Sequence, residues 1–155
     1  MAIFDLDGVI ADAAHRQHVL EAPRSRDKDW KGFFHACTDD VVIPEGKALA
    51  EALRVDVTVV VLTARIHETR AKTVDWLVQN EIRYDWLIMR GPRSGLPSSQ
   101  WKRTELVALQ GFGAEIQIAL DDDPRNIDMI RDLGVPALYV HSGYYVDRTL
   151  DVEFR

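Results

Sequence analysis

Two aspartates stand two residues apart near the start of the sequence, in the stretch "FDLDGVIAD" of residues 4–12. Asp5 and Asp7 follow three apolar residues, and Gly8 comes directly after them. Paired carboxylates can bind a divalent cation, attack an electrophilic centre or carry a proton to or from a reacting oxygen. The elements around the pair must show whether other reactive groups meet it.

Short apolar runs predict a series of strands. Residues 55–62, "VDVTVVVL", are β-branched and almost continuously apolar, which is typical of a strand buried on both faces. The other predicted strands are residues 1–4, 85–89, 116–120 and 137–140.

Helical patterns lie between these strands and are expected at residues 44–54, 69–80, 102–110 and 123–134. In the last of them Asp123 is in an N-cap position, Pro124 is in the first turn and Gly134 lies just past the end. In the 69–80 helix the apolar residues expected to share one face are Ala71, Val74, Leu77 and Val78. Strands that alternate with helices predict crossover units and a parallel α/β sheet.

In such a sheet, ligands bind outside the carboxyl ends of the strands, so the residues that follow each strand are the candidates for chemistry. Asp5 and Asp7 follow the first strand, and Lys102 opens the helix that leads to the fourth. The later strands are followed by Thr63 and Arg65 in "VVVLTAR", by Arg90 and Arg93, and by Asp121, Asp122 and Asp123 in "IALDDDPRN". Acids, a hydroxyl and cations are therefore expected at one edge of one sheet.

The acids in this group require a counter-charge. Like charges about 4 Å apart cost roughly 1 kcal/mol even in water, and more in a cleft. A divalent cation removes this repulsion, and Mg²⁺ suits carboxylate ligands that act together with a phosphate. We therefore predict a Mg²⁺ site formed by the acids of the first and fourth strand ends. A lone aspartate after a strand is more often a turn former or a helix cap, and we assign the cap role to Asp123.

The whole chain of 155 residues is expected to form a single domain with a small helical insert at about residues 11–43. The insert is basic and aromatic; it includes Arg16, Arg24, Arg26, Trp30, Phe33 and Phe34, and its three aromatic rings are expected to pack in a core. The formal net charge of −6 argues against a surface that attracts nucleic acid everywhere, although a local basic stripe is compatible with it. One cysteine, no basic and apolar leader and no run of about 18 apolar residues predict a cytoplasmic protein with no membrane partner.

The motifs together resemble those of the haloacid dehalogenase superfamily of phosphatases. The resemblance rests on "DLDGV" at 5–9, "VVVLTAR" at 59–65, Lys102 and "ALDDDP" at 119–124, which occur in the order of that family. It implies a Rossmann-like three-layer sandwich, with a central parallel sheet of about five strands, helices on both faces and a minimal cap insert.

The resemblance also implies a role for each matching residue. Asp5 would be the nucleophile that forms an aspartyl-phosphate, and Asp7 would protonate the leaving oxygen and then activate water. Thr63 would donate a hydrogen bond to the phosphate, and Lys102 would offset the charge on Asp5 and the phosphoryl group. Mg²⁺ would be held by the Asp5 carboxylate, the Asp7 main-chain carbonyl and Asp122, with Asp121 behind them.

Within the superfamily the sequence is most similar to the 3′-phosphatase domain of polynucleotide kinase-phosphatases. Arg16 lies eleven residues after Asp5, where those enzymes carry a substrate-binding arginine, and Arg65 matches their second essential arginine. "LIMRG" at 87–91, "DDDPRN" and "VHSGYY" at 140–145 are also similar, so Arg65, Arg16 and Arg90 are expected to bind substrate. The chain departs from this family in "SGLP" at 94–97, where Ser94 replaces an acid and Leu96 an arginine.

The sequence therefore predicts a Mg²⁺-dependent phosphomonoester hydrolase that removes a 3′-phosphate from a DNA or RNA end. The alternatives are a small-molecule phosphatase such as a nucleotidase, a non-catalytic phosphate-binding module, and a dehalogenase or phosphomutase. The intact set of Asp5, Asp7, Thr63, Lys102 and Asp122 argues against the module, and Asp7 favours phosphate chemistry. No "GxxxxGK[ST]" loop is present, so in end repair the chain would act as a stand-alone phosphatase or beside a separate kinase or ligase partner.

Overall fold

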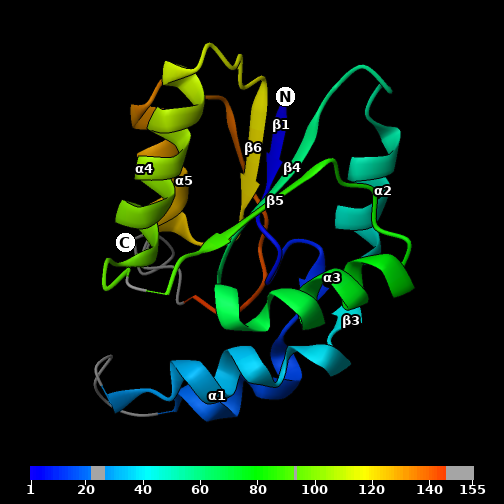
Figure 1. Cartoon of the computed structure of the whole chain (residues 1–155), viewed down its shortest axis with the longest axis vertical. Helices are drawn as coiled ribbons and strands as arrows, with labels where there is room; N and C mark the ends of the chain where they lie inside the picture. The colour runs from blue at the N-terminus through cyan, green and yellow to red at the C-terminus, as the bar shows by residue number, and fades with distance from the viewer. Residues whose placement is uncertain (22–26, 93, 146–155) are drawn as a thin grey trace, which may run out of the picture.

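The computed structural model describes residues 1–21, 27–92 and 94–145. Within them, five parallel strands form one sheet in the order β5-β4-β1-β6-β7 (Figure 1). The bounds of these strands are Ala2–Phe4 (β1), Val59–Ile66 (β4), Trp86–Arg90 (β5), Ile118–Asp121 (β6) and Ala137–Tyr139 (β7). The parallel α/β sheet predicted from the alternation of strands and helices is confirmed.

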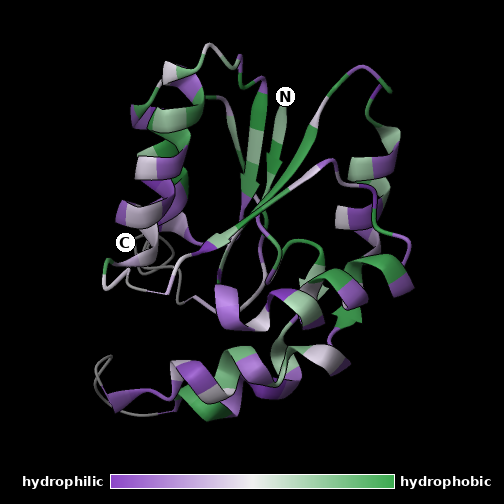
Figure 2. Cartoon of the chain, in the orientation of Figure 1, coloured by the Kyte–Doolittle hydropathy of each residue, from purple (hydrophilic) through white to green (hydrophobic). Residues whose placement is uncertain are grey.

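Two pairs of helices cover the two faces of the sheet, which makes three layers (Figure 1). The helices α2 (Pro44–Ala52) and α3 (Arg70–Gln79) pack on one face through Ala50, Trp76 and Leu77. The helices α4 (Ser98–Gly111) and α5 (Pro124–Asp132) pack on the other face, to which they contribute Trp101, Leu106, Met129 and Ile130. Figure 2 shows the central strands in the colours of apolar residues, flanked by helices that are apolar only in part.

Strand β4 begins later and ends later than predicted. Residues 55–58 lie outside it, and Val55 is 98% exposed. The guanidinium group of Arg83 holds this segment as a turn, because it donates to the main-chain carbonyls of Ala50, Leu53, Arg54 and Val57. The core of the strand, Val59–Leu62, is buried on both faces as predicted.

The buried face of α3 differs from the predicted one. Leu77 is buried, but Val78 is 65% exposed and Ala71 is also exposed. Thr73 and Trp76 take the buried positions instead, and Trp76 is fixed by a hydrogen bond from its indole N–H to the carbonyl of Asp40. The ring of Trp76, packed in the core next to Leu77, therefore sets the buried face of this helix, and its hydrogen bond to Asp40 adds to this packing.

Helix α5 begins and ends as predicted. Asp123 is its N-cap and accepts a hydrogen bond from the main-chain N–H of Arg125, and Pro124 is the first helical residue. Gly134 has a φ of 74°, which suits glycine just past a helix end.

The segment between β1 and α2 forms a layer below the sheet (Figure 1). It contains η1 (Ala14–Leu20), α1 (Trp30–His35), η3 (Cys37–Asp39) and a two-stranded antiparallel sheet of β2 (Ala11–Asp12) and β3 (Val41–Val42). Phe33 and Phe34 are buried as expected, but Trp30 is 42% exposed, which corrects its assignment to a core. Arg24 and Arg26 lie outside the described residues.

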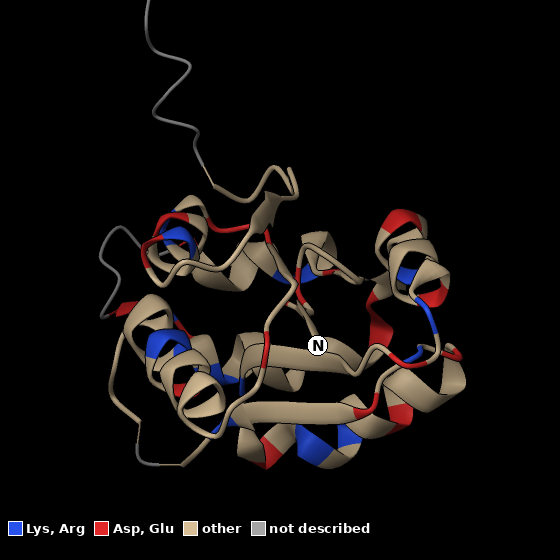
Figure 3. Ribbon diagram, turned by 90° about the horizontal axis from the view of Figure 1, so that it is seen from above, with Lys and Arg blue, Asp and Glu red and all other residues tan. Residues whose placement is uncertain are grey.

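Both signs of charge are distributed over the helices seen from above (Figure 3). None of the helices in the described parts of the chain is long and apolar enough to cross a membrane.

We predict that Gly46→Ala destabilises the fold. A Cβ atom at Gly46 would lie 1.9 Å from the main-chain oxygen of Val9, so α2 would have to move away from the loop that follows Asp7. Overpacking of this kind costs about 1–3 kcal/mol of unfolding free energy, measurable by urea titration. Gly111→Ala is the matched control, because its Cβ meets nothing within 4 Å and should leave stability equal or up to about 1 kcal/mol higher. An unchanged midpoint for Gly46→Ala would contradict the packing of α2.

Candidate active site

The carboxyl ends of β1, β4 and β6 place the predicted reactive groups together. Asp5 directly follows β1, Thr63 lies in β4 and Asp121 ends β6, and these three strands are neighbours in the sheet. After β1 the chain adds β4 and β5 on one side of that strand, and then β6 and β7 on its other side. The site therefore lies where the strand order reverses, which is where open α/β sheets bind ligands.

Lys102 lies between two of the acids. Its Nζ is 3.0 Å from Asp5 Oδ1 and 2.6 Å from Asp121 Oδ2, and the side chain is 2% exposed. Burial alone would lower the pKa of this ammonium group, but Asp121 and Asp5 outweigh it and raise the pKa above its ordinary value. Lys102 is therefore a fixed cation beside the candidate nucleophile.

The two acids at the end of β6 differ in what their oxygens contact. Asp121 Oδ2 accepts from Lys102, and its Oδ1 accepts from the main-chain N–H of Asp123 and from Asn126 Nδ2. Asp122 Oδ2 is buried and has no hydrogen-bond partner among the described residues. An unpartnered buried carboxylate oxygen is expensive unless a cation binds it. This contrast supports Asp122 as a direct metal ligand and Asp121 as a residue behind it, as the resemblance implies.

The geometry fits a divalent cation. Oxygen atoms of Asp5, Asp121 and Asp122 all lie within 4.8 Å of one another. Gly8 has a φ of 84°, and a Cβ there would lie 2.0 Å from Asp122 Oδ2, so only glycine leaves room for that carboxylate. Oxygen ligands of this kind suit Mg²⁺.

Burial and mutual repulsion also change the proton affinity of the two candidate ligands. Burial raises the pKa of Asp5, and the neighbouring Asp121 and Asp7 add to the rise, although Lys102 opposes it. Burial and Asp5 likewise raise the pKa of Asp122. A bound cation would favour the ionised form of both groups.

Asp7 is held by two buried arginines. Its Oδ1 accepts from Arg16 Nη2 at 2.6 Å and from Arg65 Nη2 at 2.5 Å. Burial alone would raise the pKa of Asp7, but Arg65 and Arg16 outweigh it and hold the pKa below its ordinary value. Both arginines also reach Asp40, which is fully buried.

Arg16 and Arg65 were predicted to bind substrate, and the structure places them behind Asp7. They are 1% and 0% exposed, and neither lines the cleft. Their contact with substrate stays a prediction, whereas their contact with Asp7 is a feature of the fold.

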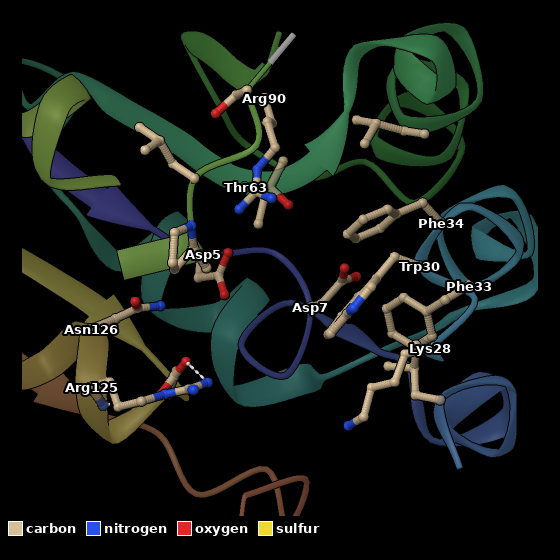
Figure 4. Close-up of a pocket in the computed structure, with 18 of the residues that line it drawn as sticks. Asp5, Asp7, Lys28, Trp30, Phe33, Phe34, Thr63, Arg90, Arg125 and Asn126 are labelled. Carbon is tan, nitrogen blue, oxygen red and sulfur yellow. Dashed lines mark hydrogen bonds and ion pairs between the residues drawn. The ribbon is translucent and has the colours of Figure 1, made fainter. Parts of the chain in front are cut away.

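A cleft of about 1280 Å³ opens above Asp5, Asp7 and Thr63, and Arg90 lines it (Figure 4). Among the described residues no acid pairs with Arg90: its buried Nε has no hydrogen-bond partner, and its guanidinium carbon lies 5.6 Å from the centroid of the Trp101 ring. Its guanidinium points towards Thr63, whose Oγ1 accepts from the main-chain N–H of Arg65 and keeps its own proton available. Arg93 lies outside the described residues.

Sequence reasoning missed two polar side chains. Asn126 donates to Oδ1 of Asp121, and its position in the motif "DDDPRN" could have marked it as a site residue. Asp40 binds both buried arginines from 24 and 25 residues away, and no local pattern marks it.

Several solved structures have a fold similar to that of this chain. A chain of the Pnkp1/Rnl/Hen1 complex matches with a TM-score of 0.72 and 21% identity, over 90% of this chain and 45% of that chain. The haloacid dehalogenase-like hydrolase SP0104 from Streptococcus pneumoniae matches with a TM-score of 0.60 and 16% identity, over 89% and 82%. The HAD family enzyme bt-2542 from Bacteroides thetaiotaomicron, a magnesium complex, matches with a TM-score of 0.52 and 13% identity, over 98% of both chains. No protein-family model matches the sequence.

The chain therefore has the haloacid dehalogenase-like fold, and the fold predicted from the motifs is confirmed. This chain spans less than half the length of the Pnkp1/Rnl/Hen1 chains that it resembles. Identities of 13–21% establish the architecture, while substrate and partners are matters for proposal.

We predict that Mg²⁺ raises the thermal midpoint of the protein and that Asp122→Asn abolishes the rise. The variant loses a buried anionic ligand, but it also loses repulsion with Asp5, so its metal-free midpoint should equal or exceed that of the native chain. Thermal unfolding with and without Mg²⁺ gives both values. Asp75→Asn, on the exposed side of α3, is the matched control and should keep the Mg²⁺ response. An undiminished response in Asp122→Asn would contradict the assigned ligand.

The metal-free protein should become less stable as the pH rises from about 4, the ordinary pKa of aspartate, to about 8, the raised pKa of Asp122. Over this range the folded protein binds more protons at Asp5 and Asp122 than the unfolded chain does, so unfolding free energy falls with pH. Urea unfolding in EDTA at several pH values measures the fall, and saturating Mg²⁺ should reduce it. A metal-free stability that rises through this range would contradict the raised pKa values.

Proposed function

We propose that this protein is a metal-dependent phosphomonoester hydrolase that acts through an aspartyl-phosphate on Asp5. The observation that carries the proposal is the arrangement around Asp5: a buried nucleophile beside Lys102, a metal-fitting carboxylate cluster, and an unpaired guanidinium and a hydroxyl facing it across the cleft. A phosphoryl group placed there would face cations and donors on several sides. Phosphoryl transfer depends mainly on such positioning and charge stabilisation.

In the proposed mechanism the Asp5 carboxylate attacks phosphorus, and the bond from phosphorus to the ester oxygen breaks. Arg65 and Arg16 keep Asp7 ionised in the free protein, so Asp7 must gain its proton once the anionic phosphate is bound, because a nearby negative charge raises the pKa of a carboxyl group. Asp7 then gives that proton to the ester oxygen, so the alcohol leaves neutral, and the Asp5–phosphoryl bond remains. Asp7 then takes a proton from water, which attacks phosphorus and restores the Asp5 carboxylate as phosphate leaves. Mg²⁺, held by the carboxylates of Asp5 and Asp122 and the main-chain oxygen of Asp7, would offset the charge of the phosphate oxygens.

Thr63 and Arg90 complete the proposed phosphate site. The hydroxyl of Thr63 can donate, because it already accepts from the main-chain N–H of Arg65. Burial lowers the pKa of Arg90 below its ordinary value, and a bound phosphate would supply the anion that this guanidinium lacks among the described residues.

For the substrate class we propose a 3′-phosphorylated end of DNA or RNA. Trp30 lines the cleft with its ring partly exposed, and Lys28 Nζ lies 5.9 Å from the centroid of that ring (Figure 4). An exposed aromatic ring beside a cation is a feature of single-strand nucleic-acid sites. The likeness to a chain of the Pnkp1/Rnl/Hen1 complex supports this choice, and a separate kinase or ligase is the partner that we propose.

Phosphate release with Mg²⁺ tests this proposal. A 3′-phosphorylated oligonucleotide, a 3′-mononucleotide and an aryl phosphate are compared, and we expect the oligonucleotide to have the highest kcat/KM. Asp5→Asn should lower release at least about 10³-fold with every substrate, because the nucleophile is lost, whereas Asp75→Asn should not. Turnover of the small substrates alone would favour a small-molecule phosphatase, and no release from any of them would refute the activity.

Trp30→Ala should raise KM for the oligonucleotide roughly tenfold, since stacking on one ring contributes about 1–3 kcal/mol. KM for the aryl phosphate should stay within about twofold, because the ring lies on the wall and not at Asp5. Steady-state kinetics on both substrates decides this. An equal effect on the two would remove Trp30 from nucleic-acid recognition.

A further inference from the structure

We infer that Asp40 is a positioning residue for the reaction: through Arg16 and Arg65 it fixes the carboxyl group of Asp7. This inference rests on the proposed phosphatase activity. Asp40 comes from the segment between β1 and α2, directly after η3. Among the described residues its side chain bonds to His15, Arg16 and Arg65 and not to Asp5 or the carboxylate cluster.

Asp40 is a buried hydrogen-bond acceptor. Its side chain is fully buried, and its Oδ1 accepts from Arg16 Nε at 2.8 Å and pairs with His15 Nε2 at 2.8 Å. Its Oδ2 accepts from Arg16 Nη2 at 2.7 Å and from Arg65 Nη2 at 2.5 Å. Its main-chain oxygen accepts from Trp76 Nε1, which ties it to α3.

The same two arginine nitrogens connect Asp40 to Asp7. Arg16 Nη2 donates to Asp40 Oδ2 and to Asp7 Oδ1, and Arg65 Nη2 does the same. The two arginines and the two carboxylates therefore bind one another, and these contacts restrict the movement of both guanidinium groups. Arg16 is held further by the carbonyl of Phe33 and by the Phe33 ring, 4.1 Å from its guanidinium carbon.

This group determines which oxygen of Asp7 is free. The short contacts converge on Asp7 Oδ1, whereas Oδ2 has a single longer contact, 3.3 Å from Arg65 Nε. Asp7 lines the cleft. Oδ2 is therefore the atom that can hold a proton against the leaving oxygen, and its direction depends on where the arginines are held.

Removal of the Asp40 charge would release the arginines. Two guanidinium groups, 1% and 0% exposed, would then share the single carboxylate of Asp7. Breaking a buried ion pair from one side leaves an uncompensated charge. Asp7 would be drawn towards the arginines and away from the substrate.

The test compares leaving groups. Protonation by Asp7 matters for an alkyl phosphate and hardly matters for 4-nitrophenyl phosphate, whose leaving group is a stable anion. The value of kcat/KM reports the steps up to the aspartyl-phosphate, so it isolates this protonation. We expect Asp40→Asn to lower kcat/KM about 10²-fold for a 3′-phosphate ester and only a few-fold for 4-nitrophenyl phosphate. Asp39→Asn, the exposed neighbour, is the matched control and should change neither.

A double-mutant cycle separates positioning from folding. If Asp40 acts through Asp7, Asp40→Asn should add almost no further loss on the ester in an Asp7→Asn background. Arg16→Lys keeps the charge but loses the fork that bridges Asp40 and Asp7, and it should show the same selective loss to a smaller degree. This milder variant keeps the test open if Asp40→Asn does not fold.

The outcomes are distinct. If the native chain releases no phosphate from either substrate, the proposed function fails. If the native chain is active and the variants lose both substrates equally, or if the losses of Asp40→Asn and Asp7→Asn multiply, Asp40 has no positioning role.

Discussion

The structure depends on how buried negative charge is compensated at the carboxyl ends of the parallel strands. Among the described residues, five carboxylates share three buried cations there: Asp5, Asp7, Asp40, Asp121 and Asp122 with Lys102, Arg16 and Arg65. A sixth, the buried Asp123, is neutralised separately by the largely exposed Arg125. Asp7 and Asp40 are balanced by the two arginines, and Lys102 serves Asp5 and Asp121. Two negative charges are left, which is the charge that one divalent cation neutralises.

The two halves of the site, which differ in how their charge is compensated, also differ in their proposed roles. The half around Lys102 holds the nucleophile and the oxygen atoms that fit a metal, and it comes from β1, α4 and the end of β6. The half around the arginines holds the acid–base residue, and it draws on the segment between β1 and α2. That segment is therefore more than a cover for the cleft, since it supplies Arg16 and Asp40 to the group that fixes Asp7.

Much of the first half could be predicted from the sequence, because strand-end residues of a parallel sheet must meet at one edge. Asp5 and Asp122 lie where that rule places them, whereas Thr63 lies within β4 and Lys102 reaches Asp5 from α4. The rotation of α3 was predicted wrongly, because the face was assigned to Ala71, Val74, Leu77 and Val78, whereas the large ring of Trp76 takes the buried position and is tied to Asp40. The same holds for the burial of Arg16 and Arg65, which depends on an acid in a short irregular segment. The exposure of Trp30 was also missed, since helical spacing cannot tell a core ring from one at the rim of a cleft.

The most direct test of the account is to trap the covalent intermediate. Asp7→Asn with Mg²⁺ and 4-nitrophenyl phosphate should release one burst of nitrophenol and stall, because the first step needs no proton from Asp7 and the second step lacks its base. Acid quenching and peptide mass spectrometry should then find a phosphoryl group on Asp5. A burst with no phosphoryl group, or with the group on another residue, would contradict the assignment of Asp5 as the nucleophile.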